Sequence, residues 1–187
     1  MSRSSKVLAL GCCVALILVF GAAALGAEAE PQVGQVLGSV KFKAPMSPED
    51  AKYLGLAKPE AFTIKDVKAP FVLVEQFNTS CPHCMHQAPF LNSVYNLVQQ
   101  DDKLKDKVKF MGVGQGNDEM AMKMWKAVQK APFPLIPDPD SDLGKALNFS
   151  PYPVTFIVDK AGKILWVHIG AFDNAEEIIK EIQKVVK

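Results

Sequence analysis

The sequence predicts an α/β domain in which a central mixed β-sheet lies between layers of helices. Apolar runs at 71–77, 108–113 and 153–158 are typical of buried strands, and they alternate with helical patterns. The last of these runs is followed by a turn at 159–162 and another apolar stretch at 163–169. This arrangement predicts a terminal antiparallel hairpin, and therefore a sheet with both parallel and antiparallel strands.

The chain has 187 residues, enough for one domain, and its first 29 are expected to lie outside that domain. Arg3 and Lys6 precede an apolar run at 7–25, and small residues at 27–29 then offer a cleavage site, as in a secretory signal peptide. The run is almost long enough to cross a membrane, so an uncleaved anchor is the alternative. We therefore expect a periplasmic or otherwise extracytoplasmic protein, tethered if this segment is retained.

Residues 30–58 are expected to form an N-terminal extension of the main domain, which we place at 59–187. Proline and glycine interrupt the extension, which favours short elements. Within it, Ser47 as N-cap and Pro48 in the first turn predict a short helix. A short strand is predicted at 62–64.

In the first half of the domain, each element follows from its pattern. The run at 71–77 is too continuously apolar for a strand that is exposed on one face, so it should lie inside the sheet. A helix is predicted from Pro82 to about Gln100, with a kink at Pro89. Asn117 is expected to cap the next helix, which runs to about residue 130.

In the second half, prolines exclude a helix at 131–139, so this segment is expected to be an extended connector. A short helix is predicted at 143–147. After the hairpin, Asp173 followed by Glu176 is a capping pattern that predicts the start of a final helix. The predicted order of the domain is therefore β-α-β-α-α-β-β-α.

The tetrad Cys81-Pro82-His83-Cys84 directly follows the first predicted strand. Two cysteines with this spacing at a strand exit are typical of a dithiol/disulfide redox centre. With Pro82 in the first helical turn, unpaired backbone N–H groups and the positive end of the helix dipole face the Cys81 sulfur and favour its thiolate. We therefore expect Cys81 to be the nucleophile and Cys84 the resolving thiol.

Composition excludes several classes of function. Because Cys12 and Cys13 lie in the apolar N-terminal segment, the domain keeps one closely spaced pair, which is not a disulfide scaffold. The formal net charge is +1, so no nucleic-acid partner is expected. Arg3 is the single arginine, so the domain lacks a guanidinium group.

These motifs resemble those of the thioredoxin-fold thiol–disulfide oxidoreductases, and over 59–187 the chain is most similar to their exported redoxin/TlpA-like branch. The tetrad, with Glu75 six residues before Cys81, instead resembles DsbA-type oxidases. The resemblance to the exported branch rests on the segments 61–66, 71–84, 136–138 and 153–159, together with Gly162.

The resemblance implies roles for three further residues. Pro153 matches the cis-proline beside the redox pair, where the preceding backbone is exposed for pairing with an extended substrate. Tyr152, a bulky residue at this position, is therefore expected to contact the substrate. Glu75 matches the buried acid that assists proton transfer to the resolving cysteine, and the alternative is an exposed glutamate on an edge strand. Ser80 replaces the tryptophan of many thioredoxins, and the spacing from Cys81 to Pro153 leaves no room for the helical domain of DsbA.

The resemblance implies an enzyme that exchanges disulfides with protein thiols through Cys81 and Cys84, without a cofactor. A membrane or exported redox partner would regenerate the pair. His83 could stabilise the Cys81 thiolate and thus the reduced form, which favours a DsbA-like oxidant. The alternative is a TlpA-like reductase of specific exported partners, for example apocytochromes.

Two competing classes fit less well. A peroxidase of the peroxiredoxin type needs an arginine beside the sulfur, and Asn78 stands where that family has a threonine. A copper-binding redox protein could draw on soft and imidazole ligands. However, only two of its candidate methionines share a helix face, so we expect no metal site. The candidate copper ligands are Cys81, His83, Cys84, His86, Met120, Met122 and Met124.

Overall fold

The computed structural model describes residues 29–37 and 39–186. Apart from its last residue, the predicted signal or anchor segment lies outside this part of the chain. No helix among the described residues has the length and apolar character needed to cross a bilayer.

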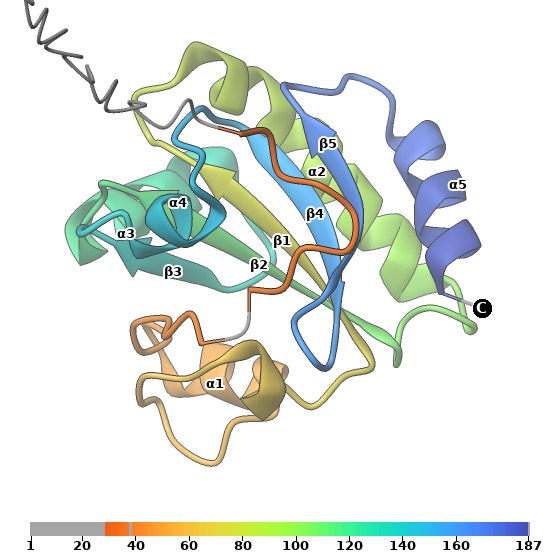
Figure 1. Cartoon of the computed structure of the whole chain (residues 1–187), viewed down its shortest axis with the longest axis horizontal. Coiled ribbons are helices and arrows are strands. Elements are labelled where there is room, and N and C mark those ends of the chain that lie inside the picture. Colours follow the sequence, from red (N-terminus) through yellow and green to blue (C-terminus); the bar gives the residue numbers. More distant parts are fainter. Residues whose placement is uncertain (1–28, 38, 187) are drawn as a thin grey trace, which may run out of the picture.

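The described strands form one mixed sheet in the order β3-β2-β1-β4-β5 (Figure 1). β2 is parallel to both of its neighbours, β1 and β3, whereas β4 is antiparallel to both β1 and β5. The predicted mixed sheet and terminal hairpin are therefore confirmed. The strands are β1 (Phe71–Phe77), β2 (Val108–Gln115), β3 (Leu135–Asp138), β4 (Val154–Asp159) and β5 (Ile164–Ile169).

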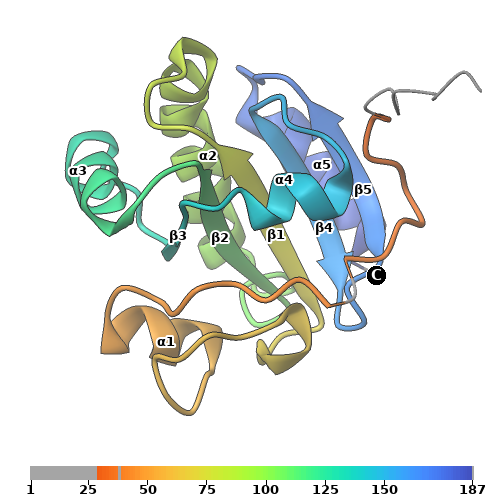
Figure 2. The same ribbon diagram turned by 60° about the vertical axis from the view of Figure 1, so that its left-hand side comes forward.

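Helices cover both faces of the sheet (Figures 1 and 2). One face packs against α2 (Pro82–Gln100), α3 (Glu119–Gln129) and α5 (Ala175–Val185). The other packs against α1 (Pro48–Leu54) and α4 (Asp142–Leu147). Because β1 is the central strand and is covered on both sides, its continuous apolar sequence is explained.

The segment before β1 contributes to the same core. Leu37, Phe42 and Leu54 are buried against the sheet, and Val36 bridges to Lys163 beside the hairpin turn. α1 begins as predicted, because the side chain of its N-cap residue, Ser47, accepts a hydrogen bond from the backbone of its first turn. Residues 30–58 thus pack on the domain to which they were assigned as an extension.

The structure corrects several predicted elements. The segment 131–139 contains a short strand, β3, because Pro137 lies at the sheet edge, where its missing N–H breaks no pairing. The predicted strand at 62–64 is reduced to one bridge, between Phe62 and Phe42, followed by a 3₁₀ turn. The N-caps of α3 and α5 are Asp118 and Asn174, each one residue after the predicted cap.

Candidate active site

The cysteine tetrad lies at the start of α2, immediately beyond the carboxyl end of the central strand. Cys81 is the N-cap residue, and its sulfur accepts a hydrogen bond from the backbone N–H of Cys84, with 3.2 Å between N and Sγ. Both cysteines are free thiols, Cys81 at 7 % exposure and Cys84 fully buried. Of the two cysteines, Cys81 is thus the one that retains some exposed surface, and its role as nucleophile stays a prediction.

The loop that carries Cys81 is fixed by side-chain amides. Asn78 accepts hydrogen bonds from the N–H and hydroxyl of Ser80, at 2.9 and 2.6 Å, and donates one to the carbonyl of Gln115. The backbone N–H of Thr79 donates to Asn117 Oδ1 at 2.9 Å. Asn117 therefore stabilises the cysteine loop instead of capping α3 as predicted.

Glu75 lies on β1 and is 3 % exposed, so the alternative of an exposed glutamate on an edge strand is wrong. Burial raises the pKa of this carboxyl to about 7, although a hydrogen bond from Gln87 acts in the opposite direction. Burial also raises the pKa of the Cys84 thiol. A hydrogen bond with Cys81 and the negative charges of Cys81 and Glu75 add to this increase. Glu75 and Cys84 are thus electrostatically linked beneath the nucleophile.

A buried glutamine, which the sequence analysis missed, holds Glu75 in place. Gln87 is fully buried on α2, and its Nε2 donates to Glu75 Oε1 at 2.8 Å and to Thr155 Oγ1 at 3.3 Å. Its own oxygen accepts the backbone N–H of Phe172 at 3.1 Å. A polar residue one helical turn after Cys84, on the face that packs against the sheet, was the signal that could have identified it.

The predicted proline loop lies on another side of Cys81. The peptide bond between Tyr152 and Pro153 is cis, and the Tyr152 carbonyl oxygen lies 3.9 Å from Cys81 Sγ. Pro153 is buried, while the Tyr152 side chain is 37 % exposed. The fold therefore brings both residues beside the redox pair, with Tyr152 accessible to a partner.

Two buried glutamines hold the segment that leads into this loop. Gln76 donates to the carbonyls of Phe149 and Pro151 at 3.3 and 3.2 Å. Gln115 donates to the carbonyl of Ser150 at 3.0 Å. Since both glutamines lie at the carboxyl ends of their strands, β1 and β2, the sheet itself positions the loop against Cys81.

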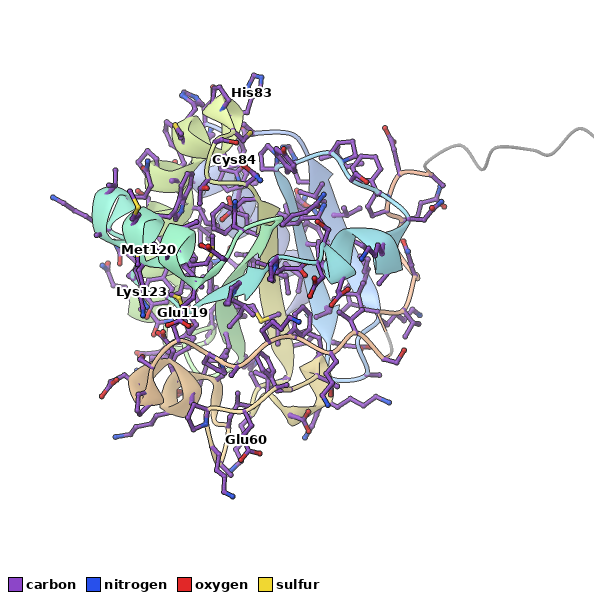
Figure 3. The ribbon with its side chains drawn as sticks, turned by 90° about the vertical axis from the view of Figure 1, so that its left-hand side faces the viewer. Glu60, His83, Cys84, Glu119, Met120 and Lys123 are labelled. Atoms are coloured by element: carbon purple, nitrogen blue, oxygen red, sulfur yellow. The ribbon has the colours of Figure 1, made fainter. Side chains whose placement is uncertain are left out.

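His83 is not brought to the sulfurs. Its side chain is exposed and projects outward from the first turn of α2 (Figure 3). Within the described residues, no hydrogen bond joins His83 to Cys81, whose sulfur instead contacts backbone groups. Any charge on His83 therefore acts on the thiolate through solvent, which weakens its effect.

The candidate copper ligands on α3 differ in burial. Met122 lies on the buried face of α3, whereas Met120 and Met124 are exposed on its outer face. His86 is exposed and lies next to Phe90. The part of the chain that the structure describes contains no cluster of three or more His, Cys, Asp or Glu residues that could hold a metal ion.

The sequence is similar to those of a known family and of thiol-disulfide oxidoreductases. The family model described as Redoxin matches residues 41–182. The thiol-disulfide oxidoreductase ResA of Geobacillus kaustophilus is 22% identical over 122 residues, which cover 65% of this chain and 67% of that protein. ResA of a Bacillus cereus strain is 26% identical over 123 residues, with the same shares covered.

Solved structures show the same fold. The solution structure of a thiol:disulfide interchange protein from Bacteroides sp. is 19% identical, has a TM-score of 0.61, and is matched over 83% of this chain and 91% of its own. The crystal structure of StoA from Bacillus subtilis is 21% identical, with a TM-score of 0.54, over 68% and 92% of the two chains. The sheet and its helical layers are thus a thioredoxin-like fold.

Proposed function

The chain belongs to the Redoxin family, and we propose that it is a thiol–disulfide oxidoreductase whose Cys81–Cys84 dithiol reduces disulfides in protein substrates. The observation that carries this proposal is the pairing of a cysteine that is 7% exposed with one that is fully buried. Cys81 lies at a helix N-terminus with an N–H group on its sulfur, and Cys84 lies beneath it near a buried carboxyl group. Such a pair can form and then resolve a mixed disulfide.

In the first step, the Cys81 thiolate attacks one sulfur of the substrate disulfide. The substrate S–S bond breaks, and its second sulfur leaves as a thiolate that takes a proton from water. A mixed disulfide between Cys81 and the substrate remains. The N–H of Cys84 and the start of α2 stabilise the attacking thiolate.

In the second step, Cys84 loses its proton to the Glu75 carboxylate and attacks the Cys81 sulfur. The mixed disulfide breaks, the substrate leaves as its second thiolate, and Cys81 and Cys84 become a disulfide. Two electrons have then passed to the substrate. With a pKa of about 7, Glu75 is suited to accept this proton near neutral pH. A dithiol of a membrane or exported partner would return the electrons.

The reducing direction is supported by the charges near the pair. Glu75 and the Cys81 thiolate both disfavour a second thiolate at Cys84, so the dithiol form gains little from ionisation. The oxidant expected from the sequence depended on His83, which is exposed. The similarity of this chain to the Redoxin family and to the thiol-disulfide oxidoreductase ResA also favours the TlpA-like alternative over the DsbA type.

The oxidant remains the second candidate function, because one observation favours it. The helix N-terminus and the Cys84 N–H stabilise the Cys81 thiolate, and a more stable reduced form makes the disulfide a stronger oxidant. The same steps then run in reverse and transfer the disulfide to a substrate dithiol.

The substrates are proposed to be extracytoplasmic proteins. This proposal rests on the apolar N-terminal segment of the sequence, with basic residues before it and small residues after it. Fractionation of cells that express the full chain, followed by N-terminal sequencing, tests both export and cleavage. Recovery of the uncleaved chain in the cytoplasm would refute the proposed location.

Trapping tests the proposed chemistry. Cys84→Ser should accumulate a mixed disulfide with its substrate on Cys81, because the second step is blocked. Non-reducing electrophoresis and mass spectrometry identify the bond. Cys81→Ser is the control and should trap nothing, because Cys84 is buried. Equal trapping by both variants would show that the roles of the cysteines are misassigned.

A further inference from the structure

An apolar groove of about 310 Å³ lies beside the cysteine loop, between the start of α2 and the outer side of α3. Figure 3 faces α3 and shows it on the same side of the molecule as His83 and Cys84. Most of the residues that line the groove are apolar. Its lining includes Thr79, Met85, Ala121, Met124, Trp125 and Val128.

Three large apolar side chains at the groove are exposed to solvent. Met85, Met124 and Val128 are 43%, 62% and 72% exposed. Met124 and Val128 lie one helical turn apart, so they form an apolar strip on the outside of α3. The buried side of the helix already packs on the core, which means that the strip is not needed to hold α3 in place.

The groove lies beside the loop that carries the reacting sulfur. Thr79 lies two residues before Cys81, and Met85 lies one turn after it, with its backbone N–H bonded to the Cys81 carbonyl. Tyr152, whose carbonyl oxygen lies 3.9 Å from this sulfur, has a side chain that is 37% exposed. A polypeptide whose disulfide reaches Cys81 can place a neighbouring residue at this surface, since three extended residues span about 10 Å.

We propose that this groove binds an apolar side chain of the substrate polypeptide, located a few residues from the cysteine that Cys81 attacks. This inference rests on the proposed function. Methionine side chains adapt to differently shaped partners, and exposed apolar patches mark interaction sites. The nearby charges on α3 compensate each other, because Lys123 pairs with Glu119 at 2.6 Å. The groove should therefore select apolar, uncharged flanking sequence.

The test uses two synthetic peptides that differ only beside a single cysteine, which is blocked as a mixed disulfide with thionitrobenzoate. One peptide carries leucine three residues to either side of the cysteine, and the other carries serine. The reduced full chain releases the coloured thiolate at a rate measured by stopped flow. We expect the leucine peptide to react about tenfold faster, because part of one large side chain is buried.

Matched variants locate the effect. Met124→Gln and Val128→Gln should bring the two peptide rates to within about twofold of each other, because the apolar surface is lost. Met120→Gln is the control, since Met120 is 65% exposed on the same helix but does not line the groove. It should leave the preference unchanged. All three variants should reduce the small disulfide of thionitrobenzoate itself at the wild-type rate.

Three results would overturn this inference. They are equal rates for the two peptides, an equal effect of Met120→Gln, and a wild-type dimer that Met124→Gln dissociates, since the groove would then bind a second copy. If the wild-type protein failed to reduce even the small disulfide, the proposed function would fail, and the groove assignment with it.

Discussion

Glu75 can act on Cys84 either as a base or only as a negative charge, and these two roles predict opposite effects of Glu75→Gln. Removing a charge that raises the pKa of Cys84 should speed the second step. Removing a base should slow it, by about a hundredfold. We expect the slower reaction, together with loss of the wild-type increase in rate as pH rises through about 7.

The measurement is the decay of a preformed mixed disulfide between Cys81 and thionitrobenzoate, followed by stopped flow from pH 5 to 9. The first step, measured in a Cys84→Ser background, is the control and should respond little to Glu75→Gln. A decay as fast as that of the wild type would rule out the role of Glu75 as the base.

The burial of Glu75 also affects stability. Its pKa rises from 4.5 to about 7 on folding, so the folded state binds the proton more tightly. The resulting stabilisation is complete below pH 4.5 and is lost as pH rises to about 7. Relative to Glu75→Gln, the free energy of unfolding of the wild-type protein should fall by on the order of 3 kcal/mol across this range. Urea unfolding of both reduced proteins at several pH values measures this difference. If the free energies of unfolding of the two proteins changed equally with pH, the prediction would be contradicted.

Gln87 should set the pH at which Glu75 works. Its hydrogen bond lowers the pKa of Glu75, so Gln87→Met should raise that pKa and move the increase in the decay rate to higher pH. The rate should be lower at pH 7 and recover at higher pH, which simple loss of structure would not produce. Gln183→Met, at an exposed position on α5, is the control. An unshifted pH profile would exclude this positioning role.

Some of these residues could be predicted from the sequence, and others could not. The spacing of Cys81 and Cys84 pointed to a redox pair, and the position of Glu75 in an apolar strand pointed to a buried acid. Gln87 is 85 residues from Phe172, whose backbone N–H it accepts, and no local sequence pattern predicts a hydrogen bond over such a separation. Proximity of His83 to the cysteines in sequence suggested contact with the sulfur, but its position on the helix directs the side chain to solvent.

At the scale of elements, the loop between β1 and α2 depends on the loop that follows β2. Asn117→Ala removes the acceptor for the Thr79 N–H, whereas Asp118→Ala removes the N-cap of α3. Each variant should lower the free energy of unfolding by about 1 kcal/mol. Only Asn117→Ala should also slow the reaction of Cys81 with a small disulfide. Equal kinetics in the two variants would show that the Thr79 contact does not position the cysteine loop.

This pair of residues also shows why helix starts are hard to predict. Asn117 and Asp118 are both good N-cap residues, and the contact of Asn117 with a loop distant in sequence decides between them. Strand β3 was missed for a similar reason. A proline in a short segment argues against a strand, unless that strand lies at the edge of the sheet, and only the sheet order shows that β3 does. The long elements β1 and α2 depend on strong local patterns, and they were predicted correctly.

At the scale of the whole molecule, the fold gathers exposed and buried groups around one cysteine pair. The Tyr152 carbonyl oxygen lies 3.9 Å from Cys81 Sγ, the apolar groove lies beside the cysteine loop, and Glu75 and Gln87 are buried. This arrangement allows electrons to flow in either direction. The direction is set by the difference in stability between the dithiol and the disulfide. The helix N-terminus stabilises the Cys81 thiolate and so the reduced form, whereas the negative charge of Glu75 disfavours ionisation of the dithiol.

The reduction potential of the Cys81–Cys84 pair therefore tests the proposed function most directly. The full chain is equilibrated with glutathione buffers at pH 7, and the fraction of disulfide is read by alkylation and mass spectrometry. A reductase should show a potential near that of thioredoxin, about −270 mV. A potential near about −120 mV, the value for DsbA, would contradict the reducing direction and assign the protein as an oxidant.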